Sequence, residues 1–120
     1  MGSEGCLFGG DKVKLSELVE YLVEPQRLSE ICSDPFPAEE KDVVLIYMKE
    51  RLDLNSDIRL FRIRDTEDEI SYEKNGTRYL QLFPLEHAIS LIESDLNLKN
   101  RGYPNSKIAE ALLEYRIFDA

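Results

Sequence analysis

The stretch SYEKNGTRYLQLF, residues 71–83, carries the strongest structural signal in the chain. Its dipeptide Asn75-Gly76 favours a type I′ hairpin turn, because both central residues of that turn need a positive φ angle. A two-residue loop also sets the register, so that Tyr72 faces Tyr79 across the two strands. Aromatic pairs in this position stabilise antiparallel strands. The stretch therefore predicts a β-hairpin.

The residues before this turn extend the hairpin into a small sheet. Residues 57–64 are rich in Ile, Leu and Phe, which is typical of a strand. A polar turn at 65–68 follows, and the two hairpin strands are expected at 69–73 and 77–83. The sequence therefore predicts a three-stranded antiparallel meander.

Helices are predicted on both sides of the meander. In the first helix, leucines and a valine recur at three- and four-residue steps and form one apolar face. Proline marks several other boundaries, because it is tolerated in the first turn of a helix and not in its interior. The predicted helices span 13–23, 25–33, 38–52, 84–96 and a last segment capped by Asn105 or Ser106, after which the tail Ile117-Phe118 is expected to fold back onto the core.

The segment 38–52 is the ambiguous one. Its middle, residues 43–48, is apolar all round, and a buried strand would show the same run. Acidic residues precede this run and basic residues follow it, which matches the dipole of a helix at both ends. The length of the segment and these charges together favour a buried helix, and we predict one here.

Length and composition indicate one globular domain. The chain has 120 residues, 42% of them hydrophobic, which is enough for a single core. We expect a flexible N-terminus at 1–12 and a single α+β domain at 13–120, with N-terminal helices, the meander and two C-terminal helices. The expected core positions are Leu18, Leu22, Val44, Tyr47, Leu60, Leu82, Ile89, Ile92 and Leu112.

The residue types that catalysis or metal binding requires do not gather in the sequence. His87 is the only histidine and has no evident nucleophile or orienting carboxylate. Cys6 and Cys32 show neither zinc-site spacing nor a disulfide framework. The carboxylates at 65–69 lack the glycine and terminal glutamate of a calcium loop. We therefore predict no enzyme activity, no metal site and no cofactor.

Two further absences bear on location. No apolar stretch approaches the roughly 18 residues that indicate a membrane-spanning helix. The N-terminus has neither the basic start nor the apolar run of a secretory signal. We therefore expect a cytoplasmic, reduced protein that has no membrane partner.

The net charge of −9, from 15 basic and 24 acidic side chains, bears on the partner. Such a field repels phosphates, which disfavours nucleic acid, and it attracts basic surfaces. We predict a small acidic protein-binding module, such as an immunity- or antitoxin-type inhibitor of a basic, nuclease-like partner. The alternatives are charge that serves only solubility and a structural or adaptor subunit, including one that forms a homodimer.

Two acidic segments are the candidate binding surface. One joins the polar turn to the hairpin, where carboxylates stand near two tyrosines. The other is the start of the segment predicted as a helix at 38–52. The predicted binding residues are Asp65, Glu67, Asp68, Glu69, Tyr72 and Tyr79 in the first and Glu39, Glu40 and Asp42 in the second.

Overall fold

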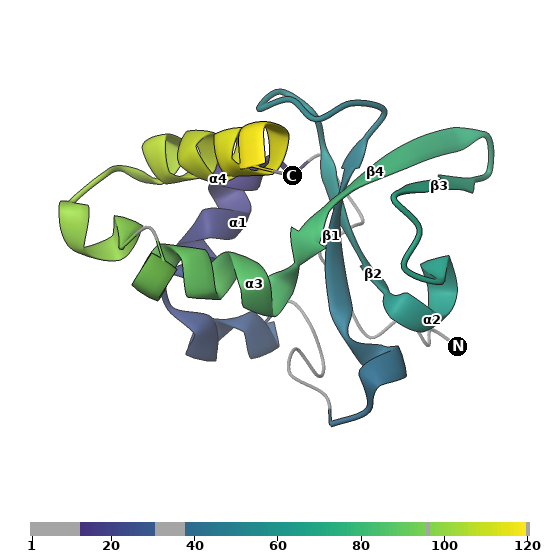
Figure 1. The fold of residues 1–120 in the computed structure, drawn as a ribbon, viewed down its shortest axis with the longest axis horizontal. Helices are drawn as coiled ribbons and strands as arrows, with labels where there is room; N and C mark the ends of the chain where they lie inside the picture. Colours follow the sequence, from purple (N-terminus) through teal and green to yellow (C-terminus); the bar gives the residue numbers. More distant parts are fainter. Residues whose placement is uncertain (1–12, 31–37, 96, 120) are drawn as a thin grey trace.

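The computed structural model of the protein describes residues 13–30, 38–95 and 97–119. In this part of the chain, helices cover one face of a four-stranded antiparallel sheet (Figure 1). The predicted α+β class is therefore confirmed. The predicted flexible segment 1–12 and both cysteines lie outside the described residues.

The sheet has the strand order β2-β1-β4-β3, and every neighbouring pair is antiparallel. The predicted meander is therefore wrong in detail, because β1 lies between β2 and β4 as a strand that the prediction lacked. The strands are β1 (Val44–Lys49), β2 (Ile58–Arg62), β3 (Ser71–Lys74) and β4 (Thr77–Pro84).

The helix predicted at 38–52 is wrong, since the structure has a short 3₁₀ turn, η3 (Glu40–Asp42), followed by β1. A central strand is covered on both faces, so its side chains are apolar without alternation. All five residues from Val44 to Met48 are buried. The charges that resemble a helix-dipole pattern instead lie in the turns at the two ends of the strand.

The hairpin is confirmed at its turn and in its register. Asn75 has a φ of 54° and Gly76 a φ of 82°, as the turn requires. Tyr72 faces Tyr79, as predicted. The polar turn predicted at 65–68 differs, because a one-turn helix, α2 (Ile63–Thr66), follows directly on β2.

A β-bulge in β4 sorts its side chains between the two faces of the sheet. Ile46 pairs with Phe83 while the next residue, Tyr47, pairs with Gln81, so Leu82 is the extra residue on β4. Leu82 and Phe83 therefore both pack in the core under the helices. Gln81 points to the opposite face, where its amide contacts Tyr47.

The helical layer is built from short segments. All nine predicted core positions are buried, although Val44 and Tyr47 lie on β1 and not on the helix predicted at 38–52. Residues 25–30 form a 3₁₀ helix, and the helix predicted at 84–96 is α-helical only at its start. The segments are α1 (Leu15–Leu22), η2 (Pro25–Glu30), α3 (Leu85–Ser90), the π-helical η4 (Leu91–Asp95), η5 (Leu98–Arg101) and α4 (Asn105–Asp119).

The last helix corrects two predictions. Neither Asn105 nor Ser106 is its cap, because both lie within α4. The tail does not fold back, since α4 continues through Ile117 and Phe118, which are 49% and 83% exposed.

Within the described segments, no helix is both long enough and apolar enough to cross a membrane.

Candidate functional site

The first predicted acidic segment forms an exposed corner of the molecule between α2 and β3, and residues 65–70 are called the acidic corner below. Two consecutive residues in it, Glu67 and Asp68, have left-handed backbone conformations with φ angles of 56° and 60°. This conformation is costly for a residue with a side chain. It reverses the chain direction and leaves the four carboxylates of the corner exposed.

Buried hydrogen bonds hold the acidic corner from below. The Tyr47 hydroxyl lies 2.6 Å from the Glu69 carbonyl oxygen and 3.0 Å from Thr66 Oγ1. A tyrosine has one hydroxyl proton, and the shorter contact places it on the carbonyl, so the Thr66 hydroxyl donates to Tyr47. Gln81 Nε2 also donates to the Tyr47 oxygen, at 3.2 Å. The corner is therefore fixed by side chains of the two central strands.

Asp68 takes part in the same network. Its carboxylate accepts a hydrogen bond from Gln81 Nε2 at 3.1 Å, and its backbone N–H donates to Thr66 Oγ1 at 3.3 Å. This carboxylate therefore has an internal partner. The side chains of Asp65, Glu67 and Glu69 have no hydrogen bond or ion pair within the described segments. These three are the carboxylates that the corner offers to a partner.

The predicted tyrosines lie in an aromatic cluster beside the corner. Tyr79 is only 7% exposed and Tyr72 is half-buried. Both rings pack edge-on against Phe61, at centroid distances of 5.3 and 5.2 Å. Two cations, Arg59 and Lys74, lie within 6.0 Å of these rings. Tyr79 is therefore a packing residue in this structure, and only Tyr72 reaches the surface.

Sequence reasoning missed Ile70, the exposed apolar residue of the corner. Its side chain is 59% exposed and directly follows Glu69 in the chain. The signal in the sequence was misleading, because an isoleucine at the start of a predicted strand suggests burial. The left-handed turn at Glu67 and Asp68 is what brings Ile70 to the surface.

The second predicted segment is already partly neutralised. Asp42 is half-buried, and its carboxylate pairs with Arg64 at 2.6 Å. Its carbonyl oxygen also accepts a hydrogen bond from Arg62. The η3 turn thus adjoins α2, so the structure brings the two predicted acidic segments to one end of the sheet. Glu39 and Glu40 stay exposed there.

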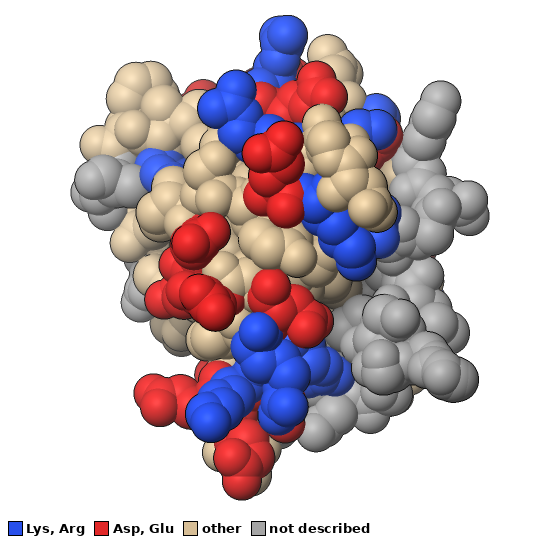
Figure 2. Space-filling model, turned by 90° about the vertical axis from the view of Figure 1, so that its right-hand side faces the viewer, with Lys and Arg blue, Asp and Glu red and all other residues tan. Residues whose placement is uncertain are grey.

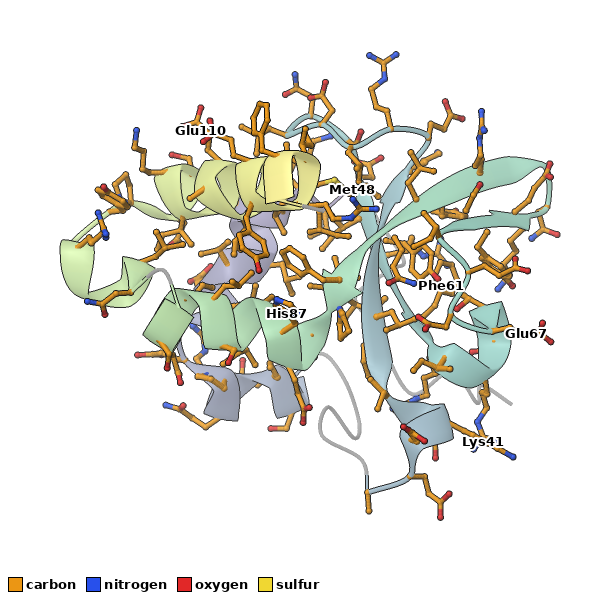
Figure 3. All side chains as sticks on the ribbon, in the orientation of Figure 1. Lys41, Met48, Phe61, Glu67, His87 and Glu110 are labelled. Carbon is orange, nitrogen blue, oxygen red and sulfur yellow. The ribbon has the colours of Figure 1, made fainter. Side chains whose placement is uncertain are left out.

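The resulting surface is mixed in charge. Figure 2, which looks onto this side of the molecule, shows acidic and basic side chains alternating around an uncharged centre. In Figure 3, Glu67 projects outward from the end of α2, Lys41 lies lower in the view beside the η3 turn, and Phe61 lies between strands. The charge at this end of the sheet is therefore mixed, although the chain as a whole has a net charge of −9.

Metal-ligating side chains do not gather at the corner. The described residues contain no group of three or more that could hold a metal ion. His87, the histidine of the chain, is exposed on the helical side and stacks on Phe83 at a centroid distance of 5.4 Å. Comparisons with protein-family models, curated proteins and solved structures give no match to this chain.

Proposed function

We propose that this protein is a small acidic protein-binding module of the immunity or antitoxin type, which inhibits a basic, nuclease-like partner. One observation carries the proposal: Ile70 is exposed beside Glu67 and Glu69 on a corner that buried hydrogen bonds hold in place. A surface of this kind combines an apolar anchor with a charged surround.

The carboxylates and the apolar groups of this surface have different roles in binding. Carboxylates speed the encounter with a basic partner and disfavour wrong partners. Buried apolar or aromatic groups hold the complex once it has formed, and here these are Ile70 and the exposed part of Tyr72. Because the Tyr47 network fixes the backbone beforehand, little ordering cost remains to be met on binding.

The test uses three substitutions that remove charge and keep shape, namely Asp65→Asn, Glu67→Gln and Glu69→Gln together. Asp68 is left unchanged because its carboxylate belongs to the internal network. Partners are captured from a native lysate, and stopped-flow association is then measured at two salt concentrations. We expect slower association, a weaker salt dependence and a smaller change in dissociation.

A matched control removes the same charge from the helical side. The triple variant Glu86→Gln, Glu93→Gln and Glu114→Gln changes three exposed carboxylates on α3, η4 and α4. If the control slows association as much as the corner variant, only the net charge matters. If no basic partner is captured, the inhibitor function loses its support.

A second candidate function, a structural or adaptor subunit, has an observation of its own. Phe118 and Ile117 expose apolar surface at the end of α4, far along the chain from the acidic corner. An exposed apolar patch is typical of an interaction site. A captured partner whose binding is lost in Phe118→Ser and kept in the corner variant would favour the adaptor function, including a homodimer.

A further inference from the structure

β3 is the last strand of the sheet, and no strand of the described residues pairs with its outer edge (Figure 1). The pair that closes a two-residue hairpin turn, here Lys74 and Thr77, is hydrogen-bonded, and bonded pairs alternate along antiparallel strands. Ser71 and Glu73 lie between the bonded positions. Their backbone N–H and C=O groups therefore point away from β4.

Nothing in the described segments satisfies these outward groups. Both Ser71 and Glu73 are exposed. Neither has a backbone hydrogen bond to any described residue outside the sheet. The next backbone bond of the ladder, from Gln81 N–H to the Ile70 carbonyl at 2.8 Å, again faces β4. The edge therefore presents two donors and two acceptors to an added strand.

A hollow of about 530 Å³ extends from β3 across β4, lined by Glu50, Ser71, Glu73, Gly76 and Arg78. Glu50, just after β1, has a left-handed φ of 69°, and its N–H donates to the Arg78 carbonyl at 2.7 Å. The bond holds Glu50 on the opposite side of Arg78 from Glu73. The hollow thus has a carboxylate on each side and one cation between them.

We propose that the β3 edge binds an extended segment of a basic protein, which joins the sheet as a fifth strand. This inference rests on the proposed function and names the way in which the partner docks. The Ser71 and Glu73 backbone groups would give up to four hydrogen bonds. Lysine or arginine side chains of the added strand would lie beside Glu73, and Ile70 would receive an apolar side chain at its end.

Charge decides between the partners that an open edge can accept. Glu50 and Glu73 line the hollow with Arg78 between them, and the exposed carboxylates of Glu67 and Glu69 precede β3 in the acidic corner. The nearby cations are Arg78 and Lys74, with Arg59 beside the Tyr79 ring. A second copy of the chain would bring a like-charged edge and a net charge of −9. Charged edges resist pairing with their own kind, so a basic segment fits better than a second copy.

The test is an amide chemical-shift titration of the ¹⁵N-labelled protein with the capped peptide Lys-Val-Lys-Val-Lys-Val-Lys. The acidic peptide Glu-Val-Glu-Val-Glu-Val-Glu is the control. We expect the basic peptide to shift the amides of residues 70–74 and to bind more weakly as salt rises. The acidic peptide should leave these amides unchanged.

Three variants separate the edge from the acidic corner. Glu73→Pro removes an outward N–H without removing a bond to β4, and proline is tolerated on edge strands. This variant should weaken binding of the basic peptide at least about fivefold. Glu73→Lys keeps the N–H and reverses the charge of the side chain, and it should also weaken binding of the basic peptide. The variant Glu67→Gln with Glu69→Gln should keep the shifts at 70–74.

Several results would overturn the docking mode. If the basic peptide changes the amide shifts of residues 65–69 alone, and does so equally in both Glu73 variants, it binds the acidic corner and not the edge. The proposed function would survive this result. Shifts at 70–74 that depend on protein concentration without peptide would identify a second copy as the occupant. Absence of any shift with the basic peptide would exclude this edge, while the capture experiment would still decide the proposed function.

Discussion

The two faces of the sheet are built from different chemistry, although the same strands supply both. The inner face, under the helices, is mainly aliphatic and includes Ile46, Met48 and Leu82, with Phe83 as its buried aromatic residue. The outer face carries an aromatic cluster that includes Tyr47, together with buried Gln81 at its side. Apolar burial alone accounts for the inner face, whereas the outer face adds directional hydrogen bonds.

This difference links stability to the candidate site on one face only. The inner face contacts the helices and has no described contact with the acidic corner. The outer face ends in the Tyr47 network, which fixes Thr66 and Glu69. A change on the inner face should therefore lower global stability, and a change in the network should act first on the corner.

The largest expected effect is on the inner face. Ile46 is fully buried in the central strand, so Ile46→Ala removes apolar contacts and leaves a cavity. We expect a loss of about 2–5 kcal/mol in the free energy of unfolding, measured by urea denaturation. Ile46→Val is the matched control and should cost about 0.5–1.5 kcal/mol. A loss below half a kcal/mol for the alanine variant would show that β1 is not the centre of the core.

The next effect, on the outer face, is smaller and more local. Tyr47→Phe keeps the ring and removes the hydroxyl that donates to the Glu69 carbonyl. We expect a loss of about 1–3 kcal/mol, because buried polar groups lose a partner. The loss should fall at the low end of this range, since Gln81 Nε2 also lies 3.3 Å from the same carbonyl oxygen. Hydrogen exchange of the Asp68 and Gln81 amides should speed up more than exchange in α1.

Tyr79→Phe is the control for this prediction. Tyr79 is also a buried tyrosine of the outer face, and its hydroxyl makes no hydrogen bond within the described segments. The substitution should therefore change stability by less than about half a kcal/mol. Equal losses in the two variants would mean that the hydrogen bonds of the Tyr47 hydroxyl do not stabilise the outer face.

The hairpin was predictable because its signals are local. The dipeptide Asn75-Gly76 fixes the turn, and the turn fixes the pairing of Tyr72 with Tyr79. β1 was not predictable in the same way, because burial on both faces removes the alternation that identifies a strand. Its place between β2 and β4 depends on contacts between residues distant in sequence.

The candidate site was predictable in its carboxylates and not in its shape. Acidic residues can be identified directly from the sequence, and Glu67 and Glu69 are both exposed. The exposure of Ile70 and the pairing of Asp42 with Arg64 depend on the turn after α2 and on its contact with η3. No sequence pattern reports either of these, because each joins an element to a neighbour that the prediction had placed wrongly.

The smallest expected effect tests whether the acidic corner holds backbone strain. Glu67 has a φ of 56°, and a left-handed conformation costs a non-glycine residue about 1–2 kcal/mol. Glu67→Gly relieves this cost and adds about 0.4–1 kcal/mol of unfolded-chain entropy. We expect stability to rise by up to about 1 kcal/mol in urea denaturation. Association with a basic partner should slow as it does in Glu67→Gln.

Gly76→Ala provides the reverse exchange on the same side of the sheet. Gly76 has a φ of 82°, and a Cβ atom there would meet nothing within 4 Å, so only the backbone conformation opposes the alanine. The left-handed conformation should cost alanine about 1–2 kcal/mol, and the lower entropy of the unfolded chain should offset about 0.4–1 kcal/mol of this cost. Stability should therefore fall by up to about 1 kcal/mol. Opposite signs at the two positions would show that the hairpin turn is relaxed by its glycine while the corner retains strain. A fall in Glu67→Gly as well would mean that the Glu67 side chain stabilises the corner, and the corner could then no longer be said to retain strain.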